Sequence, residues 1–496
     1  MRKSLPIFYN ALLLTGVNLL LRFVSTSFQV YISNQIGAEG VGLLQLVMSV
    51  GGLALTAGMA GIRTATMYLS AEELGRKNSQ NITWILRGCF LYSIICSGSI
   101  ALIIYFTAPY IAQHWINNIH TVDAIRLFAT FLPLVCLGGC MTGYFTAANR
   151  ITTLAGIEIA ERLCYMAVTM IALRFWAGHN AERACEAVVF GSGISSVLTL
   201  LCLVVLRQRE NMSKGMRIPV TRRLMETAVP LALGDNLKSG INTTENLMVP
   251  KRLALFPGEL TPLATFGVVI GMVFPVLMFP AAILFALAEL LIPELARCLA
   301  SNSQIRIQYL VRRGLKVALL YGCVCGGLLF LLAKKLCMQL YKNETAGIFL
   351  KTYSILTPML YCDSITDAMT KGLGQQKTCV RYNILTALMD VVLLYILLPK
   401  YGMTGYFISF FITHVINFAL SLQRLIKICR IHLPFNIPVL TCCSAILSVS
   451  AAKIVDPISF QIIIFVVVYF CLLVLFQIIS KEDVAWVKGL IYKNNL

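Results

Sequence analysis

Residues 6–33 read PIFYNALLLTGVNLLLRFVSTSFQVYIS, and this stretch decides the class of fold. It is long enough to cross a bilayer as a helix, which takes about 20 predominantly apolar residues. Arg22 nevertheless lies near its middle, where an ionised side chain costs about 2.5–3.5 kcal/mol. Other long apolar segments are interrupted by five more charged residues: Arg63, Asp235, Lys238, Glu245 and Glu289. We infer a helical membrane protein with a hydrated internal cavity suited to a charged cargo.

The composition supports many membrane spans. The 496 residues are 58% hydrophobic and 13% charged, whereas soluble chains carry about 25% charged residues. The net charge of +19 does not indicate a nucleic-acid partner, because the basic residues are spread through short loops without an arginine-rich block. The 17 cysteines lie mostly in apolar stretches, without a CxxC pair or a Cys/His cluster, so we expect neither disulfides nor a metal site.

Apolar segments of spanning length predict an all-α polytopic membrane protein with about fourteen transmembrane helices. Their approximate bounds are 6–33, 41–70, 84–108, 123–148, 153–175, 184–207, 224–250, 262–298, 307–337, 347–372, 378–398, 402–424, 434–453 and 458–480. The first is interpreted as a retained helix and not a signal peptide, because it is too long and has no cleavage site. The eighth is too long for one straight crossing and contains Pro275, Pro280 and Pro293, so we expect kinks in it or a tail along the cytoplasmic surface.

The distribution of basic residues predicts the orientation of the chain. If the N-terminus is inside, the inside loops and tails hold roughly 24 basic residues against about 10 outside. Both termini are therefore expected in the cytoplasm, with the protein in the cytoplasmic membrane. The outside loops are short, which leaves little room for an extracellular catalytic domain.

An internal duplication at a spacing of about 217–225 residues is indicated by the arrangement of the predicted spans more than by matching residues. Six spans, a basic linker and six more spans predict two parallel-repeat six-helix lobes plus a C-terminal helix pair. The expected parts are an N-lobe at 1–210, a basic cytoplasmic linker at 211–223, a C-lobe at 224–430, and helices 13 and 14 with a cytoplasmic tail at 431–496. Transporters built from such repeats place their cargo site between them.

Polar residues follow one face of three predicted helices. The first helix has Thr15, Asn18, Arg22, Ser25 and Gln29 at intervals of three or four, the second has Gln45, Ser49, Thr56 and Arg63, and the seventh has Asp235, Lys238 or Ser239, Asn242 and Glu245. Arg22 and Arg63 have no acid on their own stripe. A guanidinium group suits a phosphate-bearing ligand, because it donates two parallel charge-assisted bonds and keeps its proton.

A structural interpretation stays open for each of these residues. Asp235 and Lys238 can form a buried ion pair that only holds helices together. In the fifth span, Glu158, Glu161 and Arg162 are spaced to satisfy one another. The glycine-rich run at residues 37–42 is interpreted as a tight outside turn, since it lacks the lysine and hydroxyl of a phosphate-binding loop.

Several stretches resemble the stage V sporulation protein B family. They are Ile36-Gly37-Ala38-Glu39-Gly40-Val41-Gly42-Leu43-Leu44-Gln45-Leu46, Gly61-Ile62-Arg63-Thr64-Ala65, Pro230-Leu231-Ala232, Asn242-Thr243-Thr244-Glu245-Asn246-Leu247-Met248-Val249-Pro250, and Ala288-Glu289-Leu290-Leu291-Ile292-Pro293-Glu294-Leu295. That family lies in the polysaccharide-exporter branch of the multidrug/oligosaccharidyl-lipid/polysaccharide (MOP) flippase superfamily, and the likeness covers nearly the whole chain. One departure is Thr146-Ala147-Ala148-Asn149, where relatives more often have a Gln-Gly pair.

The resemblance implies a fourteen-helix flippase for undecaprenyl-pyrophosphate-linked glycans, such as a peptidoglycan precursor or a polysaccharide repeat unit. It places the lipid-linked glycan and the bilayer as partners, with cell-wall synthesis proteins as further candidates. The expected substrate-binding residues are Arg22, Arg63, Asn18, Gln29, Lys238 and Asn242, and the expected coupling or gating residues are Asp235, Glu245 and Glu289. No cofactor is expected, and the coupling ion is left open.

Three other functions each require features that this sequence lacks or leave its charged stripes unexplained. A drug/cation antiporter of the same superfamily should have an acid in the first helix, which offers Arg22 instead. A membrane glycan polymerase or ligase, which would make the protein an enzyme, needs catalytic groups near a large outside loop. A scaffold without transport leaves the charged stripes unexplained.

Overall fold

The computed structural model describes residues 4–76, 81–178, 180–208, 221–431, 434 and 436–479. Most of the predicted basic linker 211–223 and the tail after residue 479 lie outside these ranges. Asn18 and Thr15 lie in a described helix, but their side chains are outside the described part of the structure. Within the described ranges the regular elements are helices without strands, which confirms the all-α class.

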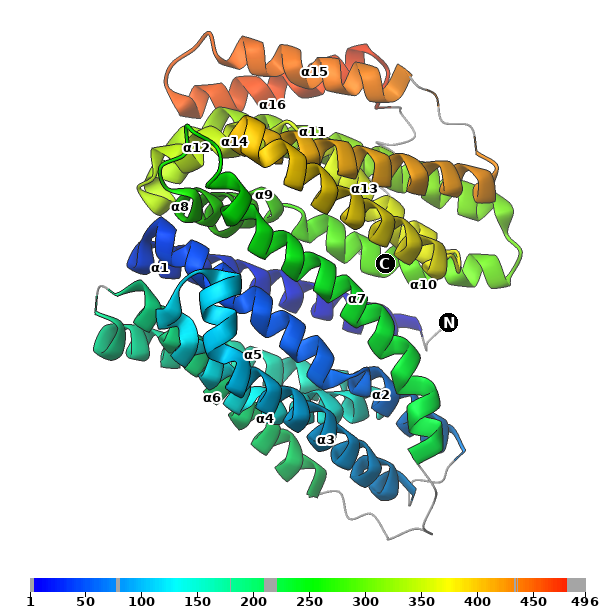
Figure 1. Ribbon diagram of the computed structural model, residues 1–496. Coiled ribbons are helices and arrows are strands. Elements are labelled where there is room, and N and C mark those ends of the chain that lie inside the picture. Colours follow the sequence, from blue (N-terminus) through cyan, green and yellow to red (C-terminus); the bar gives the residue numbers. More distant parts are fainter. Residues whose placement is uncertain are drawn as a thin grey trace. The chain divides into compact units, whose positions relative to one another are not determined.

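The helices follow one another along the chain with short connections (Figure 1). Their bounds are α1 Ser4–Met59, α2 Ile62–Gly75, α3 Ile82–Tyr110, η2 Ile111–Ile116, η3 Ile119–Thr121, α4 Val122–Ala147, α5 Ile151–Ala172, η4 Leu173–Ala177, α6 Ala181–Gln208, α7 Thr221–Leu253, α8 Pro262–Gly267, η5 Val268–Val273, α9 Phe274–Met278, α10 Ala282–Ala300, α11 Gln304–Tyr341, α12 Glu344–Ser354, α13 Thr357–Gly372, α14 Gln376–Cys429, α15 Asn436–Ala452 and α16 Ile458–Leu475.

Many of these helices are suited to a bilayer. Within the described residues, seven helices are long and apolar enough to span one, or eight if the bent pair 262–278 and 282–300 counts as one span. That pair bends by 63°, and Pro280 lies at the break, which confirms the kink predicted in the eighth segment. The chain is a multi-pass membrane protein.

Two glycines divide the longest helices. Gly37 in α1 has φ 70° and ψ 178°, and Gly402 in α14 has φ 56° and ψ −139°. Figure 1 shows the chain reversing its direction at the break in α1, so the predicted turn at 37–42 is confined to Gly37. With these breaks the helices are compatible with the fourteen predicted segments, and the number of spans remains a prediction.

The described chain forms two compact units. The first contains residues 1–271 and 391–405, and the second contains 272–390 and 406–496. The first unit thus includes α7, which the sequence assigns to the second lobe. The predicted lobe boundaries stay a prediction.

In the first unit, α7 packs along α1 and α2 (Figure 1). Thr243 Oγ1 donates to the carbonyl of Ser49 over 3.0 Å, and Asn246 Nδ2 donates to Ser49 Oγ over 3.0 Å. Small residues permit close backbone approach, as is common between membrane helices. A Cβ on Gly42 would lie 2.2 Å from the Leu263 carbonyl oxygen. Because glycine has no Cβ, α8 can pack closely against α1 at this point.

Candidate functional site

The second predicted span, 41–70, is broken just before Arg63. Ala60 and Gly61 have left-handed φ angles of 43° and 72°, and α2 begins at Ile62. The break frees the Ala60 carbonyl, which accepts a hydrogen bond from Tyr92 Oη over 3.3 Å. A Cβ at position 61 would also lie 2.5 Å from the Ala228 carbonyl oxygen. Glycine is therefore required there both by its φ and by the approach of α7.

Arg63 lies in the first turn of the new helix. No side chain caps this end of α2, and the Arg63 and Thr64 side chains are exposed. The start of a helix carries partial positive charge and N–H groups without partners in the helix. Arg63 thus adds a full charge to a helix end that already favours anions.

A cavity of about 190 Å³ opens beside Arg63. Its lining comes from the end of α1 and from α2, α4, α5 and α6: Met59, Arg63, Val135, Gly138, Gly139, Thr142, Leu154, Ile157, Glu158, Glu161, Ser196, Thr199 and Leu203. The walls combine one guanidinium, two carboxylates and three hydroxyl groups with apolar side chains. This is a polar chamber within a single unit.

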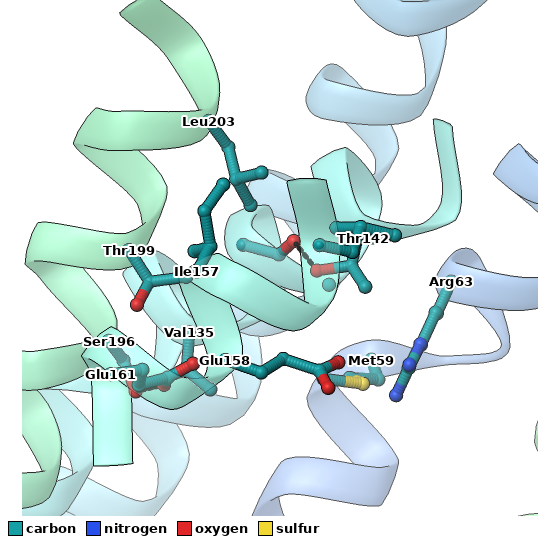
Figure 2. Close-up of a pocket in the computed structure, with 13 residues that line it drawn as sticks. Met59, Arg63, Val135, Thr142, Ile157, Glu158, Glu161, Ser196, Thr199 and Leu203 are labelled. Atoms are coloured by element: carbon teal, nitrogen blue, oxygen red, sulfur yellow. Dashed lines mark hydrogen bonds between the residues drawn. The ribbon is translucent and has the colours of Figure 1, made fainter. Parts of the chain in front are cut away.

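The acids of α5 face this cavity. Glu161 Oε1 accepts a hydrogen bond from Ser196 Oγ over 3.2 Å. Figure 2 shows Glu158 and Arg63 extending toward one another from α5 and α2, with Met59 between them in the view. No ion pair of Arg63 occurs among the described residues. The interpretation that Glu158, Glu161 and Arg162 satisfy one another therefore misses two features, the contribution of Ser196 and the common cavity with Arg63.

The stripe on the first part of α1 is only partly open. The Arg22 side chain is half-buried, and Gln29 Nε2 donates to the Gly271 carbonyl of η5 over 3.4 Å. On the second part of α1, the polar residues that precede Arg63 make contacts within the protein. Ser49 contacts α7, and Thr56 Oγ1 donates to carbonyl oxygens of its own helix at Gly52 and Leu53.

The stripe on α7 is open over most of its length. Asp235, Lys238 and Asn242 are exposed, and Glu245 is half-buried. In the described part of the chain no ion pair joins Asp235 to Lys238, which disfavours the interpretation of these two as a structural pair. Glu289 lies on α10 in the second unit, and its side chain is exposed.

Helix geometry gives the depth of the cations. Arg22 precedes Gly37 by 15 residues, and Lys238 precedes the end of α7 at Leu253 by 15 residues, so each lies about 22 Å from that end. Arg63 follows Gly37 by 26 residues, or about 39 Å. α1 and α7 are in matching register, because Gly61 lies against Ala228. Gly61 is about as far from Gly37 along its helix as Ala228 is from Leu253. The three cations thus occupy two levels about 16 Å apart.

The second unit contains two acids that were not predicted from the sequence, Asp390, which is buried, and Asp363, which is half-buried. Asp363 accepts two hydrogen bonds of 3.3 Å from Asn417 Nδ2. Asp390 Oδ1 accepts from Ser409 Oγ over 2.5 Å and from Thr413 Oγ1 over 3.3 Å. Both acids interrupt predicted apolar spans, which is the signal that identified Arg22. A buried carboxylate with hydroxyl neighbours can exchange a proton or hold a monovalent cation.

An ionic cluster ties the end of α2 to the start of α7. Arg223 bonds Glu72 over 2.6 Å and Glu73 over 3.2 Å, and Asn81 Nδ2 donates to Glu73 over 3.1 Å. Burial alone would raise the pKa of Glu73, but the hydrogen bonds from Asn81 and Arg223 outweigh it, so the pKa is lowered. This cluster fixes the two helix ends next to one another.

Sequence comparisons identify relatives of the chain. Residues 7–249 match the model of a family described as "Polysaccharide biosynthesis protein". Stage V sporulation protein B of Bacillus subtilis (strain 168) is 22% identical over 412 residues, which cover 79% of this chain and 78% of the relative. These matches confirm the resemblance stated from the sequence.

Solved structures share the fold. "Lipid II flippase MurJ, inward closed conformation" aligns with a TM-score of 0.68 at 13% identity, over 94% of this chain and 98% of that one. An inward-facing multidrug resistance MATE family transporter of the MOP superfamily aligns with a TM-score of 0.65 at 13% identity, over 84% of this chain and 99% of that one. At this identity the likeness establishes the fold alone, which the chain shares with these two solved structures.

Proposed function

We propose that the chain is a flippase that moves an undecaprenyl-pyrophosphate-linked glycan across the cytoplasmic membrane by alternating access. The observation that carries the proposal is Arg63, which stands at the start of a helix after a break within a span and faces a polar cavity. Transporters use the starts of such broken helices to bind anionic groups. The relatives with this fold, a lipid II flippase among them, support the substrate class.

The two levels of cations suggest an order of events. The diphosphate first binds Arg63 and the start of α2, nearer the predicted cytoplasmic side. It then moves toward the level of Arg22 and Lys238, where Asn18, Gln29 and Asn242 lie within about three turns along their helices. Each guanidinium can donate paired charge-assisted hydrogen bonds to phosphate oxygens. The lipid tail stays in the bilayer throughout.

Carboxylates near these cations have a second role. Glu158 competes with the diphosphate for Arg63, which keeps binding reversible. Asp235 and Glu245 on α7 favour release of the anion, and Glu289 on α10 acts in gating or coupling. Asp390, with its two hydroxyl donors, is a further candidate for coupling to an ion. The membrane potential can also drive the cycle, at about 2.3 kcal/mol per charge per 100 mV.

The predicted orientation completes the proposal. Both termini lie in the cytoplasm, where the cargo is loaded, and the glycan is delivered to the opposite face. Cell-wall synthesis proteins that make or use the glycan are proposed partners.

A second function is favoured by one observation. A drug/cation antiporter needs acids in its cavity, and Glu158 and Glu161 supply two in the first unit. The arginine in the same cavity opposes a cationic cargo, so we place this function second.

Complementation of a strain that lacks its own lipid flippases tests the proposal. We expect growth to be restored by the full chain when it reaches the membrane. Failure to restore growth, together with efflux of a cationic dye from the same cells, would instead support the antiporter.

A further inference from the structure

The cavity beside Arg63 continues beyond the guanidinium between α4, α5 and α6. In Figure 2, Arg63 lies on one side of the view and Glu161, Ser196 and Thr199 are grouped on the other, with Glu158 extending between them. Glu158 and Glu161 are three residues apart on α5, so they share one face of that helix. The cavity thus has a cationic end at Arg63 and an acidic end at Glu161.

The two ends of the cavity suit different parts of a ligand. A diphosphate carries negative charge on its oxygens, so the guanidinium attracts it and the carboxylates repel it. An ionised carboxylate only accepts hydrogen bonds, with about four sites for donors on its two oxygens. Ser196 Oγ uses one of these sites on Glu161 over 3.2 Å, which orients the carboxylate. A ligand group at the acidic end therefore has to donate hydrogen bonds.

The size and the other walls of the cavity favour a single sugar ring. Its volume of about 190 Å³ is below the range of about 300–1,000 Å³ for drug-sized ligands, so a whole oligosaccharide does not fit. Ile157 and Leu203 offer apolar surface to the C–H face of a ring, and the Thr199 hydroxyl can donate or accept a hydrogen bond. A prenyl chain is unsuited, because it would cover the carboxylates without giving them hydrogen-bond partners.

We propose that Glu158 and Glu161 bind the hydroxyl groups of the first sugar of the glycan, which is bonded directly to the diphosphate. This inference rests on the function proposed above, since it requires the diphosphate to lie at Arg63. The covalent bond then holds the first sugar, and no later one, next to the two carboxylates. Hydrogen bonds from its hydroxyl groups to carboxylates are charge-assisted and therefore stronger than those between neutral groups.

The consequence is selection of the glycan-bearing lipid over a lipid diphosphate that has lost its glycan. When the sugar is present, its hydroxyl groups donate to Glu158, which otherwise competes with the diphosphate for Arg63. A diphosphate without a sugar gives the two carboxylates no donors and places negative charge beside them. A site built to hydrogen-bond a hydroxyl group rejects ligands that lack this group for the same reason.

Binding isotherms of the purified full-length protein in nanodiscs test the inference. The sugar-free ligand is the methyl ester of farnesyl diphosphate, and the other ligands carry one glucose or one N-acetylglucosamine in place of the methyl group. All three have the same charge, so the ratio of dissociation constants, methyl ester to conjugate, reports the sugar alone. We expect at least one conjugate to bind about tenfold tighter than the methyl ester, which is the size of one hydrogen bond to a charged group.

Matched variants identify the residues responsible. E158Q/E161Q should bring the ratio close to one while the methyl ester still binds, because Arg63 is unchanged. A change in the availability of Arg63 alone would shift both dissociation constants equally and leave the ratio as it was. E186Q should keep the wild-type ratio, because Glu186 is a half-buried glutamate of the same unit that does not line the cavity. Glu158 is exposed, so E158Q alone should lower the ratio if Glu161 proves necessary for folding.

The outcomes separate this inference from the proposed function. Equal binding of the methyl ester and both conjugates by the wild type would overturn the inference and leave the function in place, because the diphosphate would still be bound. Binding of none of the three ligands would remove the function itself. A wild-type ratio in E158Q/E161Q would also overturn the inference, since the carboxylates would then have no part in recognising the sugar.

Discussion

The backbone oxygen of Arg63 lies only 2.4 Å from the position that a Cβ on Gly143 would occupy. α4 can approach α2 at this point because residue 143 has no side chain. The contact sets the position of the arginine backbone relative to the cavity.

Gly143→Ala should therefore reduce transport. The added methyl group must push α2 away from α4, at a cost of about 1–3 kcal/mol typical of overpacking. Transport of a lipid-linked glycan in vesicles would measure the loss. Gly138→Ala is the matched control, because Gly138 is on the same helix and lines the same cavity but a Cβ there meets nothing within 4 Å. Equal activity of the two variants would show that the contact does not position Arg63.

Arg22→Ala should abolish complementation of a flippase-deficient strain while the protein still reaches the membrane. Arg22→Lys should also be impaired, because a point charge cannot reproduce the paired hydrogen bonds of the guanidinium to phosphate. Growth of the strain, with membrane content measured by immunoblot, checks both variants. Equal rescue by lysine would mean that charge alone is sufficient, and full activity of the alanine variant would remove Arg22 from the site.

Glu158→Gln separates the two candidate functions. In the flippase, loss of this carboxylate removes a competitor for Arg63, so binding of a short polyprenyl diphosphate should tighten by about tenfold, equivalent to about 1.4 kcal/mol. In a cation antiporter, the same change should weaken binding of the cation. Binding isotherms for both ligands, with the wild-type protein as reference, decide between the two outcomes.

The ionic cluster between α2 and α7 predicts a dependence of stability on pH. The pKa of Glu73 is lowered from its ordinary value of 4.5, so the folded state favours the ionised form. The stabilisation is complete above that value and is lost as the pH falls through the lower pKa of the folded protein. The midpoint temperature of thermal unfolding should therefore be constant from about pH 8 to 5 and should fall below about pH 4.

Glu73→Gln provides the comparison for this titration. The variant should be less stable at neutral pH, because Arg223 loses a charged partner, and its decline in acid should be shallower. Parallel curves for the variant and the wild type would show that other carboxylates cause the acid sensitivity.

The sequence predicted the class of fold because long apolar segments and charge asymmetry are local signals. The segment around Arg22 and the kink at Pro280 belong to this category. The break at Gly61 was missed, since the apolar run continues through it and Gly58 nearby remains in a regular helix. Whether such a glycine takes a left-handed φ depends on α7, which lies more than 160 residues away in the chain.

The candidate site was predicted in part for a similar reason. Arg63 was identified from its charge, but its cavity with Glu158 and Glu161 depends on the packing of α5 and α6 beside α2. The polar face of a single helix does not show which other helices pack against it. Asp390 was a different kind of omission, because it interrupts an apolar span in the same way as Arg22.

The most direct test follows the headgroup of a defined lipid-linked glycan in vesicles that contain the purified protein. With wild-type protein we expect the headgroup to become accessible to a reagent on the opposite face. With Arg63→Ala we expect accessibility near the protein-free level, while Arg126→Ala should behave as the wild type. Equal transfer by the Arg63→Ala and wild-type proteins, or no transfer above the protein-free level by the wild type, would contradict the account.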